Sequence, residues 1–265
     1  MRQIVFPILL ILLYASCTSK FGRILKSKDS EYKYKMAEQY FVNKKYNNAQ
    51  QLFEDLFPIM KGKENYEDLF YKLGYCYFYE KDYLNAENIF KTFTETFPSS
   101  KRSEECEYMR AYCYYKQSPK VDLDQTTTNK AMSLMQAFIN MHPNSEKQKE
   151  ATEIIDLCRE KLELKEYKSA DLYYNLGHFK AASVAFNNIL EDFPDSKLSD
   201  EYKFLEIKSY YKYAELSIEE KQEERFKKVL SECTEFVERF SDSKYINDVN
   251  KFITLTNNYL KKLKK

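Results

Sequence analysis

The fold is decided by residues 67–100, which read EDLFYKLGYCYFYEKDYLNAENIFKTFTETFPSS. In the first half, one helix face is marked by residues at positions i, i+3, i+4 and i+7, namely Phe70, Leu73, Gly74 and Tyr77. The second half keeps helical spacing from Ala86 until Pro98, which stops a helix. Small side chains at Gly74 and Ala86 let two helices approach closely. The stretch therefore predicts a pair of antiparallel helices.

The same pattern recurs along the chain. Four segments end alike, at Phe97-Pro98-Ser99-Ser100, His142-Pro143-Asn144-Ser145, Phe193-Pro194-Asp195-Ser196 and Phe240-Ser241-Asp242-Ser243. An alanine stands twelve residues before each of the three prolines, at Ala86, Ala131 and Ala182. Proline ends one helix, and the serine after it can cap the next. Copies of the unit are predicted at about residues 30–60, 67–100, 104–145, 163–196 and 200–243, followed by a closing helix from Tyr245 to Leu263.

The order of large residue, Leu, Gly, Tyr, Ala, Phe and Pro resembles the tetratricopeptide repeat (TPR). The third and fifth copies are longer than the others, since Ala111 and Ala131 stand 20 residues apart where Gly74 and Ala86 stand 12 apart. We therefore predict an all-α TPR solenoid of about five helix pairs plus a closing C-terminal helix. Each repeat of such an array buries a face against its neighbours, and the array has a concave surface.

The N-terminus carries a targeting signal. Met1-Arg2 is followed by an apolar run from Ile4 to Leu13, which is too short to span a bilayer. The sequence Leu13-Tyr14-Ala15-Ser16-Cys17 then resembles the lipobox of bacterial lipoproteins, although Tyr14 stands where an aliphatic residue is usual. We predict a signal peptide over residues 1–16, acylation of Cys17, and a lipidated tether over residues 17–29. An ordinary signal peptide followed by a chance cysteine is the alternative.

Composition and motifs argue against an enzyme. The net charge is +1, so no basic footprint for nucleic acid is expected. Neither of the two histidines, His142 and His178, has a second ligand at metal spacing, and there is no glycine-rich phosphate loop or nucleophile motif. We expect no catalytic residues, no metal and no cofactor apart from the lipid on Cys17. Five cysteines beyond Cys17 lie in helical apolar patterns and are predicted to be buried free thiols: Cys76, Cys106, Cys113, Cys158 and Cys233.

A closer resemblance covers essentially the whole mature chain. The lipobox, the expanded third repeat and the long helical stretch 146–175 are similar to the BamD family of lipoproteins in the outer-membrane β-barrel assembly machine (the Bam complex). Three segments carry this likeness, Tyr108-Met109-Arg110-Ala111, Leu123-Asp124-Gln125 and Tyr167 to Pro194. Ala111 stands where the family has glycine.

The resemblance implies a location and two kinds of partner. The mature protein would sit on the periplasmic face of the outer membrane of a Gram-negative bacterium, since Thr18 rather than aspartate follows Cys17. Repeats 1–3, residues 30–145, would receive the C-terminal signal of unfolded outer-membrane proteins, which alternates apolar side chains and ends in an aromatic residue. Repeats 4–5 and the closing helix, residues 146–265, would dock on the periplasmic domains of the barrel-shaped assembly protein. The alternative is another envelope TPR lipoprotein that acts in pilus assembly or cell-wall coordination.

A row of aromatic residues is predicted to line the concave groove and bind peptide. The set is Tyr34, Phe41, Tyr71, Tyr75, Phe78, Tyr79, Tyr108, Tyr112 and Tyr115. Their rings would give stiff apolar contact area, and their hydroxyls would reach a peptide backbone. The alternative is that they pack between neighbouring helices, because a helix that is apolar nearly all round is usually buried.

Arg110 falls where the repeat requires an apolar residue. A buried arginine needs an anionic partner, and the inserted loop offers Asp122 and Asp124. We predict a structural ion pair between Arg110 and one of these acids, which would fix the loop.

Overall fold

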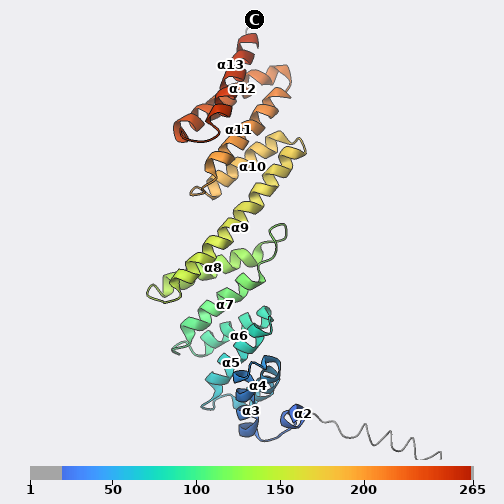
Figure 1. Cartoon of the computed structure of the whole chain (residues 1–265), viewed down its shortest axis with the longest axis vertical. Helices are drawn as coiled ribbons and strands as arrows, with labels where there is room; N and C mark the ends of the chain where they lie inside the picture. Colours follow the sequence, from blue (N-terminus) through green and yellow to red (C-terminus); the bar gives the residue numbers. More distant parts are fainter. Residues whose placement is uncertain (1–19, 264–265) are drawn as a thin grey trace, which may run out of the picture. The chain divides into compact units, whose positions relative to one another are not determined.

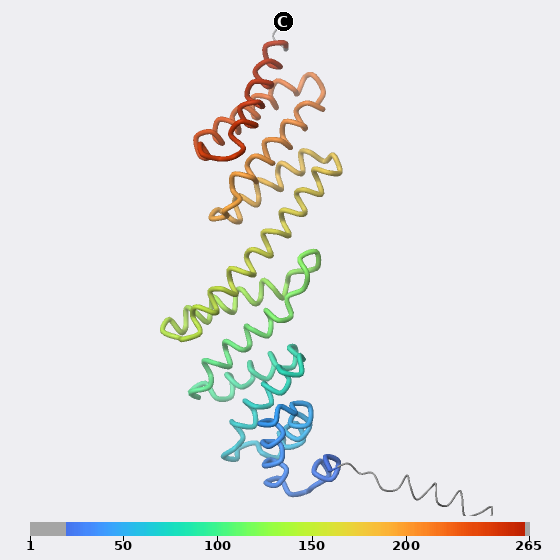
Figure 2. Tube along the Cα trace, viewed as in Figure 1, coloured from blue at the N-terminus to red at the C-terminus, as the bar shows by residue number. Residues whose placement is uncertain are grey.

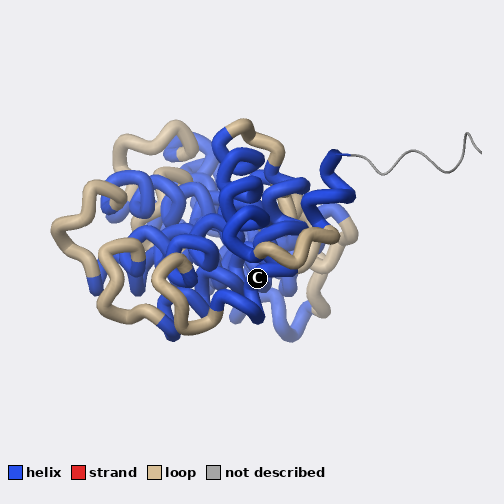
Figure 3. The backbone as a smooth tube through the Cα atoms, turned by 90° about the horizontal axis from the view of Figure 1, so that it is seen from below, coloured by secondary structure: helices blue, strands red, loops and turns tan. Residues whose placement is uncertain are grey.

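The computed structural model describes residues 20–263. Helices and loops make up this whole range, without any strand (Figure 3). The predicted signal peptide, residues 1–16, and the predicted lipidation site Cys17 lie outside the described residues.

Twelve helices follow one another through residues 20–263 (Figure 1). They are α2 (Lys20–Leu25), α3 (Ser30–Val42), α4 (Tyr46–Met60), α5 (Tyr66–Tyr79), α6 (Tyr83–Thr96), α7 (Ser103–Gln117), α8 (Thr126–Met141), α9 (Gln148–Asn175), α10 (Phe179–Asp192), α11 (Ser199–Glu215), α12 (Glu219–Arg239) and α13 (Ile246–Leu263). From α3 to α12 they form five pairs, and α13 is the closing helix. The predicted all-α TPR fold is confirmed, including the long α9 and the insertion between α7 and α8.

The chain divides into two compact units, whose backbone can be followed by colour in Figure 2. The N-terminal unit contains the described residues up to 120 together with 124–158, and the C-terminal unit contains 121–123 and 159 onward. Helix α9 begins in the first and ends in the second. The functional division predicted between residues 145 and 146 stays a prediction.

Close packing inside the second repeat explains the glycine of the motif. A Cβ atom added to Gly74 would lie 2.7 Å from Cε1 of Phe90, a distance that no real Cβ keeps. Phe90 and Phe93 on α6 are fully buried, so the ring has little freedom to move. Gly74 is therefore required by the contact between α5 and α6.

Repeats 2 to 5 each end on a serine that stabilises a turn, and in three of them the serine has a second task. Its hydroxyl oxygen accepts the backbone N–H two residues later, as in Ser100 with Arg102 at 3.0 Å, which turns the chain into the next helix. In three repeats the hydroxyl also donates to an acid on the first helix of the same repeat, with Ser100–Glu67 at 2.6 Å, Ser196–Glu163 at 2.5 Å and Ser243–Asp200 at 2.7 Å. The predicted capping serine thus caps a turn and also joins the two ends of its repeat.

The cysteines lie where the pattern predicted. All five described cysteines are buried and have free thiols. Burial raises the pKa of Cys113 and that of Cys233 to about 12, which keeps both thiols protonated. None of the described helices is both long enough and apolar enough to cross a membrane.

Candidate functional site

An aromatic path runs across the first three repeats of the N-terminal unit. It consists of Phe41, Tyr46, Tyr71, Tyr75, Phe78, Tyr79, Tyr112 and Tyr115. Tyr46 and Tyr79 stack with ring centroids 4.3 Å apart, and Phe78 meets Tyr112 of the next repeat at 5.8 Å. The remaining links have centroid separations of 5.0–6.5 Å and join every member. Seven of the nine residues predicted from the sequence therefore form one connected set.

Two predicted groove residues are not counted in this path, although one of them, Tyr108, contacts it through Tyr112. Tyr108 is only 2 % exposed, and its ring lies between Tyr112 and Phe138 at centroid distances of 5.7 and 5.6 Å. It belongs to the core, so its assignment to an open groove was wrong. The reason is the one considered as the alternative, that a helix apolar on several faces packs against neighbours. Tyr34 is partly exposed and packs edge-on against Phe53.

Sequence reasoning missed Tyr46, which links the first two repeats. The sequence also did not predict which members of the path are most exposed to solvent. Tyr79 is the most open of them, with 47 % of its surface exposed, while the others are half-buried. Tyr79 is therefore the ring best placed to meet a ligand.

The tyrosine hydroxyls already have partners within the chain. Tyr71 donates to Glu105 at 2.7 Å, Tyr75 donates to the other oxygen of the same carboxylate, and Tyr34 donates to Asp68 at 2.7 Å. Burial and these hydrogen bonds raise the pKa of all three phenols. The expectation that these hydroxyls serve a peptide backbone is therefore wrong for these three. Their bonds hold the rings in place, which reduces the entropy lost on binding.

A ladder of charges accompanies the path from repeat to repeat. Lys72 contacts Glu38 at 2.5 Å and Asp68 at 2.7 Å, and Arg102 contacts Asp68 at 2.8 Å. Burial alone would raise the pKa of Asp68, but hydrogen bonds from Lys72 and Tyr34 outweigh it and lower that pKa. The sequence signal for this ladder was the 34-residue spacing between Glu38 and Lys72 and between Asp68 and Arg102, which is one repeat length.

Arg110 has an anionic partner, but a different one from that predicted. Its Nε lies 2.9 Å from Oε1 of Glu87, which belongs to α6 of the preceding repeat. Asp122 pairs instead with Lys168 at 2.8 Å, and Asp124 accepts the N–H of Thr126 at 2.9 Å. The prediction chose acids from the expanded loop because they were near in the sequence. The structure uses an acid that the helix pairing brings near, and it ties repeat 2 to repeat 3.

The C-terminal unit contains an open apolar hollow beside the turn between α9 and α10. Its volume is about 710 Å³, and it is lined by Tyr173, Gly177, His178, Phe179, Lys180, Ala181, Val184, Ala185, Asn188 and Tyr213. Gly177 adopts φ +78° in the turn, which favours glycine. Tyr174 packs edge-on against Phe179 at 5.2 Å and closes the base of the turn.

Cations surround this hollow and lie over aromatic faces. Lys208 lies 4.7 Å from the ring centroid of Tyr174, and Arg225 lies 4.1 Å from that of Tyr213. Lys180 lies 6.0 Å from the same Tyr213 ring. Within the described part of the chain, Lys180, Lys208 and Arg225 form no ion pair with a carboxylate. The hollow is thus apolar, with Lys180 in its lining and Lys208 and Arg225 over the rings of Tyr174 and Tyr213 beside it; we call these three cations its positive rim.

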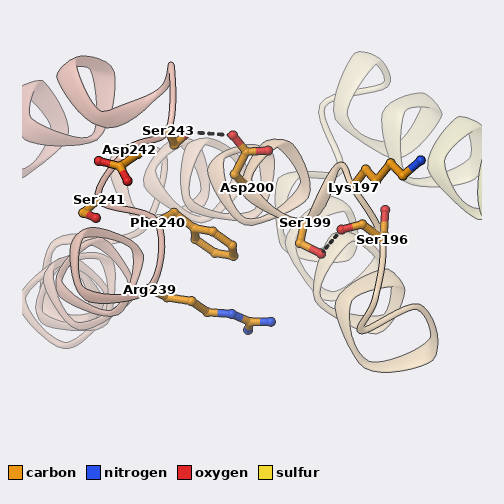
Figure 4. Close-up of a pocket in the computed structure, with 9 residues that line it drawn as sticks. All are labelled: Ser196, Lys197, Ser199, Asp200, Arg239, Phe240, Ser241, Asp242 and Ser243. Atoms are coloured by element: carbon orange, nitrogen blue, oxygen red, sulfur yellow. Dashed lines mark hydrogen bonds between the residues drawn. The ribbon is translucent and has the colours of Figure 1, made fainter.

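A second, polar hollow of about 370 Å³ lies between two repeat ends of the same unit (Figure 4). The close-up shows Ser243 hydrogen-bonded to Asp200 and Ser199 hydrogen-bonded to Ser196 across its lining. Its polar side chains hydrogen-bond within the ends of the repeats, so the hollow is explained by the packing of the repeats.

A buried charge cluster lies deeper in the C-terminal unit. The ammonium group of Lys203 contacts Glu232 at 2.5 Å, Glu206 at 3.0 Å and Glu235 at 3.1 Å. Burial raises the pKa of Glu206 to about 7, and the nearby carboxylates Glu232 and Glu235 add to this rise, although Lys203 opposes it. Burial opposes the charge of Lys203, but the neighbouring carboxylates outweigh it and raise its pKa.

Across residues 20–263, no group of three or more His, Cys, Asp or Glu side chains could hold a metal ion. His142 is held by Glu107 at 2.7 Å between its Nε2 and the carboxylate. His142 lies at the end of a repeat, and its contact with Glu107 therefore has a structural role.

The sequence of residues 26–229 matches a family described as YfiO, outer membrane lipoprotein. No curated protein matches the chain. Among solved structures, a Podosopora anserina putative kinesin light chain with nearly identical TPR-like repeats is similar at 9 % identity, with 77 % of this chain and 94 % of that chain covered and a TM-score of 0.34. The TPR2AB-domain:pHSP90-complex of yeast Sti1 is similar at 9 % identity, with 86 % of this chain and 98 % of that chain covered and a TM-score of 0.39.

Proposed function

Since the chain belongs to the YfiO family of outer membrane lipoproteins, we propose that it is a non-enzymatic scaffold of the machinery that assembles β-barrel proteins in the outer membrane. It is anchored on the periplasmic face through a lipid on Cys17, and it needs no cofactor or metal. Its partners are other proteins, bound by surfaces of the two units. The observation that carries this function is the match to the outer membrane lipoprotein family over residues 26–229, most of the chain.

The aromatic path is the proposed receptor for unfolded barrel proteins. Side chains on one face of an extended strand recur about every 6.6–6.8 Å, because each residue advances 3.3–3.4 Å and successive side chains alternate between faces. The rings of Phe41 and Tyr46 lie 5.6 Å apart and those of Phe78 and Tyr112 lie 5.8 Å apart, a comparable spacing. A strand with apolar residues at every second position can therefore place successive side chains on successive rings.

The hydrogen bonds behind the path support this role. Glu105 holds both Tyr71 and Tyr75, so their rings are ordered before a ligand arrives. Aromatic side chains have only two rotatable bonds, and fixing them in advance lowers the entropy cost of binding further. Tyr79, the most exposed ring, is proposed as the first contact of the client segment.

The hollow of the C-terminal unit is the proposed docking point for the barrel-shaped assembly protein. Its apolar lining suits a buried anchor side chain, and the rim of Lys180, Lys208 and Arg225 suits an acidic surface. Such a charge arrangement raises the association rate and makes it dependent on salt. The docking partner is therefore expected to present an apolar residue flanked by carboxylates.

A pull-down of the tagged mature lipoprotein from its own envelope in mild detergent tests the function. Recovery of the barrel-shaped assembly protein in near-stoichiometric amount is the expected result. Recovery of pilus or cell-wall proteins in its place would show that the protein is a different envelope scaffold.

Two variants test the two surfaces separately. The double substitution Tyr75→Ala and Tyr79→Ala should weaken capture of a synthetic C-terminal strand peptide at least tenfold while leaving recovery of the assembly protein unchanged. Val184→Asp in the hollow should produce the opposite pattern.

A further inference from the structure

The first part of the described chain carries a concentration of positive charge. Residues 20–45 contain eight lysines and arginines against three acids, a net charge of +5, whereas the whole chain has a net charge of +1. Lys33 is buried and paired with Asp55. The other seven cations form no ion pair within residues 20–263: Lys20, Arg23, Lys26, Lys28, Lys35, Lys44 and Lys45. Their charge is therefore available to a partner.

Helix α2 folds back on the first repeat and brings separate parts of this charge together. The ring of Phe21 packs edge-on against Tyr40 with centroids 5.6 Å apart, and Ile24 is buried. The carbonyl of Tyr40 accepts the N–H of Lys45 at 2.9 Å. The start of α2 and the turn between α3 and α4 consequently lie at the same end of the repeat. Sequence reasoning treated residues 17–29 as a tether and missed this helix.

The side chains on the outer face of α2 are cationic. Phe21 and Ile24 point inward at positions i and i+3, so Lys20 and Arg23, one residue before each, point together toward solvent. Lys44 and Lys45 are exposed in the neighbouring turn, where Lys44 adopts φ 57°. We call Lys20, Arg23, Lys44 and Lys45, together with Val42, the basic face.

Val42 adds an exposed apolar side chain beside the turn that carries Lys44 and Lys45. It ends α3 and leaves 76 % of its surface exposed, although valine usually packs inward. An exposed apolar side chain near cations suits the boundary between lipid headgroups and acyl chains, where the apolar group enters and the cations stay among the phosphates.

We propose that the basic face lies against a bilayer surface and binds the phosphate groups of anionic lipids. The proposal rests on the anchoring of Cys17 that the proposed function includes. Cys17 precedes Lys20 by three residues, which reach at most about 11 Å, so an acyl anchor there holds the basic face at the membrane. Electrostatic attraction between a cationic surface and anionic lipids adds to the membrane binding that an acyl anchor provides. The basic face is the second contact, and it sets which side of repeat 1 faces the lipid.

Vesicle binding tests the proposal without the lipid anchor. The chain from residue 17 onward, carrying Cys17→Ser, is mixed with phosphatidylcholine vesicles or with vesicles containing one third phosphatidylglycerol, and bound protein is measured by flotation. We expect at least tenfold stronger binding to the anionic vesicles, with a loss of most of that difference at high salt. Binding that is equal on the two compositions, or absent from both, would overturn the proposal.

A charge-matched pair of variants assigns the binding to this face. The first variant carries Lys20→Gln, Arg23→Gln, Lys44→Gln and Lys45→Gln. The control carries four other exposed and unpaired lysines changed to glutamine: Lys61, Lys63, Lys101 and Lys130. Since a lysine near an anionic surface contributes roughly fivefold, the first variant should lose at least tenfold in binding while the control loses less than threefold. Equal losses would show only a general effect of net charge and would refute the assignment.

Tryptophan fluorescence provides a second measurement, because the chain contains no tryptophan of its own. Val42→Trp places a single tryptophan beside Lys44 and Lys45, and its emission should move to shorter wavelength on anionic vesicles as the indole enters the interface. An unchanged spectrum with protein bound would place another surface on the membrane. These results are independent of the pull-down, which reports protein partners. If the protein does not bind vesicles but still recovers the assembly protein, the membrane proposal is refuted and the proposed function stands.

Discussion

The two units use the same repeat but place their tyrosines in different electrostatic surroundings. In the N-terminal unit the hydroxyls of Tyr71 and Tyr75 share Glu105, and the cations Lys72 and Arg102 are both paired with acids. In the C-terminal unit the rings around the hollow carry Lys208 and other cations that have no carboxylate partner among the described residues. The aromatic path has one cation without a carboxylate partner among the described residues, Lys116 over Tyr112, whereas three such cations lie at the hollow.

This difference separates two kinds of recognition. A fixed aromatic surface discriminates through apolar contact and accepts many sequences that share an alternating pattern. A positive rim around an apolar hollow favours one acidic partner and speeds its encounter. The scaffold function proposed above, with many unfolded clients and one permanent partner, would use both surfaces.

Removing the buried lysine of the C-terminal unit should have the largest effect. Lys203→Met leaves the buried Glu206 without its cation, which should lower the free energy of unfolding of that unit by about 3–5 kcal/mol. Thiol labelling followed by mass spectrometry localises the loss, because Cys233 lies in the C-terminal unit and Cys76 in the N-terminal unit. Cys233 should become reactive at lower denaturant concentration while Cys76 stays unchanged.

Lys228→Met is the matched control. It removes the same charge from an exposed side chain that lies 3.8 Å from Glu232, and it should cost less than about 1 kcal/mol. If both variants exposed Cys233 equally, the buried cluster would contribute no more than surface charge. If Cys76 and Cys233 became reactive together, the two units would unfold as one and the comparison would apply only to their surfaces.

The corresponding change in the N-terminal unit should be smaller. Glu105→Ala removes the acceptor shared by Tyr71 and Tyr75 and should cost about 2 kcal/mol, since two partly buried hydroxyls lose their partner. Glu105→Gln keeps an acceptor oxygen and should restore about half of this loss. Unfolding in urea measures both, with Cys106 labelling as the local probe. The exposed neighbour changed in Glu104→Ala serves as control and should leave the stability of the unit within about 0.5 kcal/mol.

Sequence alone predicted the helices because the repeat spacing determines which residues face each other within a pair. Gly74 and the alanines mark close helix contacts, and the prolines and serines mark the ends, so five pairs and α13 could be placed. The same spacing identified seven members of the aromatic path.

The errors arose where side chains make contacts between neighbouring helices, because the sequence pattern of one helix does not show which residues of the next helix it meets. Tyr108 and Tyr112 share one helix, and only the ring of Phe138 decides that the first is buried. Arg110 found Glu87, 23 residues earlier, because α6 and α7 pack together. Helix α2 was missed since six residues are too few for a periodic signal, and its stability comes from Phe21 and Ile24 packing on repeat 1.

The pH dependence of stability should have opposite signs in the two units. Glu206 has an ordinary pKa of 4.5 and a folded-state pKa of about 7, so the stabilisation from its protonation is complete below 4.5 and is lost as the pH rises through 7. Asp68 has a lowered pKa, so its contribution is present above 3.8 and is lost as the pH falls below that value. Between pH 7.5 and 6 the C-terminal unit should gain about 1 kcal/mol and the N-terminal unit should hardly change.

Thiol labelling of Cys233 and Cys76 in urea at each pH reads the two units separately. Glu206→Gln should abolish the gain in the C-terminal unit, since the amide does not titrate. A gain that persists in this variant would assign the pH dependence to another group.

The smallest effect on stability, and the sharpest test of the comparison, concerns Lys208. Lys208→Gln removes the cation over Tyr174, and an exposed contact of this kind is worth about 0.5–1 kcal/mol. The stability of the C-terminal unit should therefore change only slightly. Docking of the acidic partner, by contrast, should slow several-fold at low salt and approach the wild-type rate at high salt, because the rim acts mainly through long-range attraction.

The matched change in the N-terminal unit is Lys72→Gln, which removes a cation that the chain itself neutralises. This variant should lose more stability than Lys208→Gln, since Glu38 and Asp68 are left without their partner, but its salt dependence of docking should stay that of the wild type. Association rates by surface plasmon resonance across a salt series, together with urea unfolding, separate the two quantities. If Lys72→Gln altered the salt dependence of the association rate as much as Lys208→Gln, docking would depend on overall charge. The proposal that the hollow binds a specific acidic partner would then be refuted.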